Sequence, residues 1–141
     1  MELREVPQPR PGPQEVLVRV HAASLNPVDF KIREGMLKVI QRYPLPAVMG
    51  NDLAGIVEAR GEGATRFAEG DRVFARVAKD SLGAFADYAV VPENLLARMP
   101  PSLDFETAAG VPLAGLTALQ ALRDELALKP GSRVLIPAGA G

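Results

Sequence analysis

Prolines and glycines are spread along the whole chain, and their spacing constrains the fold more than any other feature. The 141 residues include thirteen of each. Proline cannot donate a sheet hydrogen bond and ends helices, while glycine supplies the backbone conformations that tight turns need. Because these residues interrupt the chain at short intervals, we expect many short strands joined by turns, rather than a disordered tract.

Several segments between these interruptions carry the patterns of strands. The clearest is 15–23, in which Val16, Val18 and Val20 fall on one face. Residues 53–59 read as a strand with Gly55 at a bulge or a close backbone approach. The remaining segments predicted as strands are a short edge strand at 3–6 and two further strands at 72–75 and 84–91.

Two helices are expected. Asn26 can cap a short one at 30–34, with Pro27 in its first turn and Gly35 closing it. A longer one begins after Ser102 or Asp104 and runs towards residue 130. Its leucines recur at near-helical spacing, which indicates core packing: Leu113, Leu116, Leu119, Leu122 and Leu126.

The last nine residues differ from the rest of the chain in their pattern of residue types. The apolar run at 133–137 is typical of a strand buried on both faces. The small residues Ala138, Gly139 and Gly141 follow it, and such residues let a phosphate approach the backbone. The segment therefore predicts the first strand and opening turn of a dinucleotide-binding unit.

Composition narrows the classes of partner. The formal net charge of -1 gives no electrostatic case for nucleic acid or an anionic membrane. No apolar run approaches the roughly 20 residues that span a bilayer, and the N-terminus lacks the apolar core of a signal peptide. The chain has no cysteine, so it forms neither a disulfide nor a thiolate metal site. We expect a cytoplasmic protein, and we interpret the single histidine, His21, as structural.

Six short motifs occur in a recognisable order: 23–29, Gly50 to Val57, 67–73, 83–88, 116–118 and the terminal 134–141. With them the chain resembles the medium-chain dehydrogenase/reductase superfamily, specifically its zinc-free quinone oxidoreductase branch. The resemblance implies a mainly β fold with α. It consists of a GroES-like β-barrel at 1–111, the catalytic domain, followed at 112–141 by a junction helix and the first strand of a truncated Rossmann domain.

The resemblance also bears on metal binding. Zinc-dependent relatives place ligands where this chain has Asn26, Asn51 and Leu113. A catalytic zinc needs three nitrogen, sulfur or carboxylate ligands and an open position, so we expect no metal. Without that Lewis acid, hydride transfer to a quinone or enone is easier to support than alcohol oxidation, because the acceptor's own conjugation spreads the charge.

The resemblance implies roles for individual residues, each with a structural alternative. Asn26 would be catalytic and would contact the cofactor, or it would only cap a helix. Tyr43 would donate a proton to a developing oxyanion, or it would only pack on the barrel. Thr117 would lie near the nicotinamide, or its hydroxyl would bond within its helix. Ala138, Gly139 and Gly141 would begin the pyrophosphate turn. Asp52 would lie beside the position of the relatives' metal site, although we favour the alternative that it only holds a turn, and Asp29 would fix the Asn26 turn.

The implied activity is reduction of a quinone or enone by NADP(H), favoured over NAD(H), without zinc. Relatives are often homodimers through the Rossmann portion that this chain lacks, so a homodimer would form there. The alternative from another class is a non-enzymatic GroES-like module that serves as an interaction or structural unit.

Overall fold

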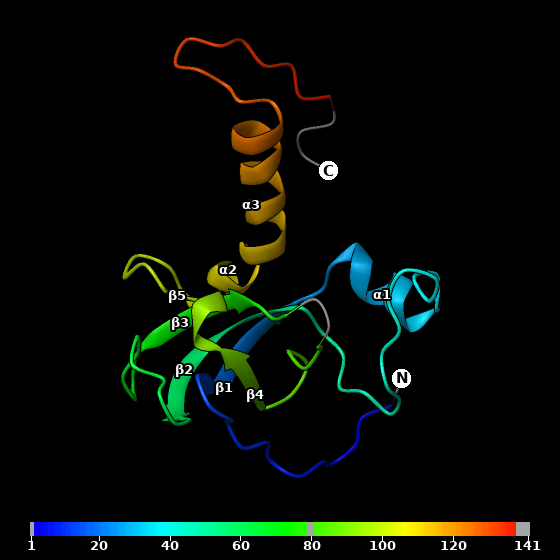
Figure 1. Cartoon of the computed structure of the whole chain (residues 1–141), viewed down its shortest axis with the longest axis vertical. Helices are drawn as coiled ribbons and strands as arrows, with labels where there is room; N and C mark the ends of the chain where they lie inside the picture. The colour runs from blue at the N-terminus through cyan, green and yellow to red at the C-terminus, as the bar shows by residue number, and fades with distance from the viewer. Residues whose placement is uncertain (1, 79–80, 138–141) are drawn as a thin grey trace.

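The computed structural model describes residues 2–78 and 81–137, and Figure 1 shows a small β domain with one helical column rising from it. The strands are β1 (Glu15–Ser24), β2 (Asp52–Arg60), β3 (Arg72–Arg76), β4 (Tyr88–Pro92) and β5 (Leu96–Arg98). The helices are α1 (Pro27–Arg33), α2 (Phe105–Ala109) and α3 (Pro112–Leu119), which continues into a π-helical segment, Gln120–Glu125. No helix in the described part of the chain is long and apolar enough to cross a membrane.

The five strands form one antiparallel sheet in the order β4-β1-β2-β3-β5. The prediction for β1 is confirmed, since Val16 and Val18 are fully buried and Val20 packs against the same core cluster. Gly55 of β2 also behaves as predicted: a Cβ atom there would collide with the carbonyl oxygen of Arg19 on β1. The two central strands therefore approach each other as closely as their backbones allow.

The two edge strands, β4 and β5, are connected by a short turn and do not pair with each other. β4 and β5 lie at opposite ends of the strand order, yet the 3-10 turn Glu93–Leu95 alone separates them in sequence. The sheet must therefore curl so that the end of β4 and the start of β5 come close, as the curved sheet in Figure 1 shows. Glu93 fixes this turn to the loop between β2 and β3, because its Oε2 accepts the N–H groups of Thr65 and Arg66, both at 2.9 Å.

Two strand predictions in the β domain differ from the structure, and one strand was not predicted. Residues 3–6 form no strand and lie exposed, because the proline-rich stretch that follows at 7–13 keeps them away from a sheet edge. The strand expected at 84–91 begins only at Tyr88, and β5 was not anticipated at all. Three residues are too short to carry a detectable alternation, so β5 is visible only through its pairing with β3.

The single long helix predicted after residue 104 is broken in two. Asp104 does cap α2, since its Oδ1 accepts from the N–H of Thr107 at 2.8 Å. Gly110 then ends α2, and Pro112 starts α3 at a position where its missing N–H costs nothing. Inside one continuous helix Pro112 would have removed a hydrogen bond and clashed with the preceding turn.

The leucines of α3 do not form a core, which contradicts the packing predicted for them. Leu116, Leu119 and Leu126 are 45%, 47% and 60% exposed. The helix projects away from the sheet, so that no other described element covers this face (Figure 1). Only its first turn contacts the β domain, and that contact matters for the site described below.

The strand expected at 133–137 is also absent. These residues adopt no regular structure, and Leu135 is 88% exposed. A β-strand needs a neighbour to pair with, and none of the described strands lies beside this segment. Ala138, Gly139 and Gly141 lie outside the described residues. The fold class itself, a mainly β domain of GroES-like type followed by a helix, is confirmed by the sheet and by solved structures compared below.

Candidate active site

The site begins at the N-terminus of α1, where the sequence Asn26-Pro27 ends β1 and starts the helix. Asn26 is the N-cap, as predicted, and Pro27 occupies the first turn. The Oδ2 atom of Asp29 accepts from the backbone N–H of Asn26 at 2.7 Å, which satisfies a donor that the helix leaves without a partner. The prediction that Asp29 fixes this turn is therefore confirmed.

Asp29 also reaches the strand that follows α1 in the chain. Its side chain is buried, and its Oδ1 accepts from Nδ2 of Asn51 at 2.7 Å. Asn51 is buried as well and sits just before β2. Each oxygen of the Asp29 carboxylate therefore has its own donor, and α1 is tied to the start of β2.

Asp52, the first residue of β2, is wholly buried and makes longer connections than predicted. Its Oδ2 accepts from Nδ2 of Asn26 at 3.1 Å and from the backbone N–H of Leu113 at 2.9 Å. The interpretation that Asp52 only holds a local turn is therefore wrong, because it joins the N-cap of α1, β2 and the first turn of α3. Its Oδ1 is buried and has no hydrogen-bond partner among the described residues.

Burial dominates the electrostatics of Asp52. Desolvation of the ionised form raises the pKa of its carboxyl group above the ordinary 3.8. The hydrogen bonds from Leu113 and Asn26 and the positive charge of Arg76, its partner on β3, oppose that rise, and the charge of Asp29 adds to it. A partly unsatisfied, desolvated carboxyl group next to Asn26 is typical of a functional cleft.

The bonds of Asn26 limit what its side chain can do for a ligand. Its Nδ2 donates to Asp52 and, at 3.4 Å, to Oγ of Ser24, so both amide hydrogens have protein acceptors. The carbonyl oxygen has two lone pairs and can accept a further bond even at a helix N-cap. Asn26 is therefore equipped to accept a hydrogen bond from a ligand rather than to donate one.

Within the described part of the chain, the other predicted site residues are Thr117 and Tyr43. The hydroxyl of Thr117 donates to the carbonyl oxygen of Leu113 at 2.7 Å, which is the intrahelical alternative, and the residue is exposed. Thr117 thus lies one turn along α3 from the N–H that Asp52 binds. Tyr43 is half-buried in the loop between α1 and β2. The structure joins Asn26 to the start of the helix that carries Thr117.

Sequence reasoning missed the part that Asn51 and the backbone of Leu113 play in this network. Asn51 lies in the Gly50-Asn51-Asp52 motif, so the resemblance did point to the right place. No three His, Cys, Asp or Glu side chains within residues 2–78 and 81–137 lie where they could hold a metal ion together. The site pairs two neutral amides with two buried carboxyl groups, Asn26 with Asp52 and Asn51 with Asp29.

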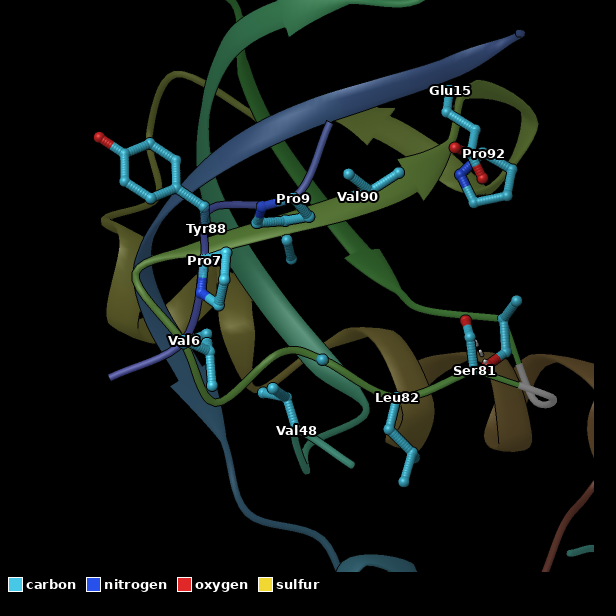
Figure 2. Close-up of a pocket in the computed structure, with 14 residues that line it drawn as sticks. Val6, Pro7, Pro9, Glu15, Val48, Ser81, Leu82, Tyr88, Val90 and Pro92 are labelled. Atoms are coloured by element: carbon cyan, nitrogen blue, oxygen red, sulfur yellow. Dashed lines mark hydrogen bonds between the residues drawn. The ribbon is translucent and has the colours of Figure 1, made fainter. Parts of the chain in front are cut away.

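A separate groove lies away from this network. It measures about 660 Å³ and lies between the N-terminal segment and the face formed by β4 and the loop before it. Figure 2 shows Val6, Pro7 and Pro9 along the N-terminal segment, with Val48 and Leu82 from two other loops. None of the predicted site residues lines this groove. A smaller hollow of about 50 Å³ does touch Asp29, beside α1.

Comparison with known proteins places this geometry in a family. The family model described as "Alcohol dehydrogenase GroES-like domain" matches residues 12–101. A quinone oxidoreductase of Pseudomonas aeruginosa is 41% identical over 100% of this chain and 42% of its own length. An NADPH-dependent alkenal/one oxidoreductase of Arabidopsis thaliana is 43% identical over 90% of this chain and 34% of its own length.

Solved structures agree. The quinone oxidoreductase of Pseudomonas syringae has a TM-score of 0.83 and 40% identity, covering 92% of this chain and 38% of its own. The chain thus spans less than half the length of the relatives that it matches. The order of its motifs, its antiparallel sheet and the family match all agree. The chain therefore belongs to the alcohol dehydrogenase GroES-like domain family, within the medium-chain dehydrogenase/reductase superfamily.

Proposed function

We propose that this chain is the catalytic-domain portion of a zinc-independent, NADPH-dependent oxidoreductase that reduces quinones or enones. The observation that carries the proposal is the amide of Asn26, held at the junction of α1, β2 and α3 by Asp52. The relatives named as quinone oxidoreductase and as NADPH-dependent alkenal/one oxidoreductase support the substrate class and the cofactor. The neutral amides at the site support a reaction that proceeds without a Lewis acid.

Asn26 would hold the nicotinamide end of the cofactor. The Asn26 carbonyl oxygen keeps acceptor capacity, and the carboxamide of a nicotinamide offers the complementary N–H donors. The bound cofactor supplies the hydride, and the chain's own residues bind, align and exclude water. Because the donors of Asn26 are already taken, it would position the ring rather than polarise the carbonyl of the acceptor.

Tyr43 is then the candidate for the acceptor's oxygen. A phenol hydroxyl is a hydrogen-bond donor, and it can donate to an oxygen that gains negative charge. Its loop lies between α1 and β2, the two elements that carry the amide network. Thr117 would approach the nicotinamide from α3, using the lone pairs of a hydroxyl whose proton is already bound to Leu113.

The test is NADPH oxidation in the presence of a simple quinone or a conjugated enone, using the gene product that carries these 141 residues. Asn26→Ala should lower kcat/KM for NADPH about tenfold, the equivalent of one hydrogen bond of about 1.4 kcal/mol. Asn94→Ala is the matched control, because this asparagine is exposed in the turn between β4 and β5. Its activity should equal that of the unmodified protein.

Two results would overturn the proposal. One is a folded protein that oxidises NADPH with neither class of acceptor. The other is activity that disappears on dialysis against a chelator and returns with zinc, which would contradict the metal-independent chemistry. Equal kcat/KM values for Asn26→Ala and Asn94→Ala would remove Asn26 from the site while leaving the reaction class intact.

A further inference from the structure

We propose that Asp52 is a positioning residue: its Oδ2 atom fixes the orientation of the Asn26 amide and links that amide to the first turn of α3. The inference rests on the proposed function, in which the carbonyl oxygen of Asn26 contacts the nicotinamide. It assigns to Asp52 a task that acts through Asn26 and requires no contact with the reacting atoms.

The first argument is the convergence of three elements on one atom. Nδ2 of Asn26 comes from the N-cap of α1, the acceptor is the first residue of β2, and the N–H of Leu113 belongs to α3. The two donors lie 26 and 61 residues away from Asp52 in the chain. Bonds of such long range, both ending on Oδ2, specify an arrangement that no local turn requires.

The second argument is the energetic cost of the arrangement. Asp52 is wholly buried, and its Oδ1 has no hydrogen-bond partner among the described residues. A buried carboxylate with one oxygen unsatisfied is expensive, and an asparagine would accept the same two hydrogen bonds without the desolvation of a charge. A group that costs stability in this way requires another explanation, and the orientation of Asn26 supplies one.

The third argument is that the side-chain amide of Asn26 has two possible orientations. A half turn of the Asn26 side chain exchanges its NH₂ and its carbonyl oxygen, which are nearly equal in size. The carboxyl oxygen of Asp52 can only receive a donor from Asn26, so it selects the orientation in which Nδ2 faces inward. The carbonyl oxygen then points away from Asp52, where a ligand's N–H can reach it.

The hydrogen bond from Leu113 gives Asp52 a second effect, because it also fixes the start of α3. The N–H of Leu113 is one of the first-turn donors that a helix cannot satisfy itself, and Asp52 supplies its acceptor. The same oxygen therefore sets both the amide that would face the nicotinamide and the start of the helix carrying Thr117. Losing the acceptor should release both at once.

A kinetic double-mutant cycle on the gene product tests the inference. Asp52→Leu removes the acceptor while keeping a side chain branched at Cγ, and it should lower kcat/KM for NADPH about tenfold. Asp52→Asn keeps one carbonyl oxygen for both donors and should recover most of that loss. In an Asn26→Ala background, Asp52→Leu should lower kcat/KM by much less than tenfold, because only the part of its effect that passes through Leu113 and α3 remains.

A purely structural role predicts a different pattern. The effect of Asp52→Leu would then be the same with and without Asn26, and either that result or an Asp52→Asn variant as poor as Asp52→Leu would overturn the inference. Thermal unfolding of each variant shows whether it is folded at the assay temperature. Asn94→Ala again serves as the control for an asparagine outside the site.

Nuclear magnetic resonance of the 141-residue chain tests the geometry without any activity. Asp52→Asn should leave the Leu113 backbone N–H and the Asn26 side-chain NH₂ signals near their original positions, whereas Asp52→Leu should shift both. The side-chain signal of Asn51, which Asp29 holds, is the internal control. Unmoved Asn26 and Leu113 signals in folded Asp52→Leu would refute the positioning role. An inactive gene product with both signals shifted would instead refute only the proposed function.

Discussion

Asparagine at position 52 should make the chain more stable than aspartate does at neutral pH. The folded-state pKa of Asp52 is raised by burial. A raised folded-state pKa contributes stability below the unfolded value, near 3.8, and that contribution is lost as pH rises through the folded value. The ionised carboxylate is therefore a net cost at pH 7, worth about 1.4 kcal/mol for each unit of elevation.

The geometry shows why asparagine avoids this cost without losing a bond. Both donors meet at Oδ2, and a single carbonyl oxygen in that place can accept from both. The NH₂ group replaces Oδ1, which has no partner to lose. Leucine at the same position leaves two donors unsatisfied, each costing about 1 to 3 kcal/mol, so Asp52→Leu should lose about 2 to 6 kcal/mol.

Urea unfolding followed by circular dichroism, from about pH 3 to pH 7, measures these differences. The advantage of Asp52→Asn should grow as pH rises and vanish below the ordinary pKa of the carboxyl group. Asp71→Asn is the control of opposite sign, because the N–H of Ala68 and the guanidinium of Arg98 lower the pKa of Asp71. An Asp52→Asn advantage that is largest at low pH, or an Asp52→Asn chain as unstable as Asp52→Leu, would refute the reasoning.

Three further substitutions test the surrounding structure by the same unfolding measurement. Asp29→Asn should cost about 1.5 to 3 kcal/mol, since each Asp29 oxygen serves its own donor and one is lost; a neutral result would contradict this. Gly50→Ala should cost about 1 to 3 kcal/mol, because Gly50 has φ +100° and its new Cβ would meet the ring of Phe85; equal stability would show that the ring moves freely. Thr117→Val should change stability by no more than about 0.5 kcal/mol, because its bond to Leu113 is exposed, and a larger loss would mark a packing role.

Much of the sheet could be predicted because its signals are local. The alternation of Val16, Val18 and Val20 identifies a strand whatever its partners are, and Gly55 lies where two backbones come close. The cap formed by Asp104 is equally local, since donor and acceptor are three residues apart. The break between α2 and α3 had a local signal as well, because the leucine periodicity starts only at Leu113, directly after Pro112, and proline suits the first turn of a helix.

The polar network could not be predicted in the same way. The bond between Asp52 and Leu113 joins residues that are 61 positions apart, and no pattern in either segment refers to the other. The resemblance indicated Asn26 and Asp52 as neighbours of the site, but only the three-dimensional structure shows which atoms meet. The exposed leucines of α3 show the same limit, because periodicity reports a face and not what covers it.

The missing ladder between β4 and β5 has a consequence for how the sheet can open. Every other junction in the sheet is a ladder of backbone hydrogen bonds, whereas this one is held by the turn Glu93–Leu95 and the contacts of Glu93. Opening it breaks no ladder, so amide hydrogens along the outer edges of β4 and β5 should exchange with solvent before those of β1 and β2. The domain would then open between β4 and β5, while β1 and β2 stay paired.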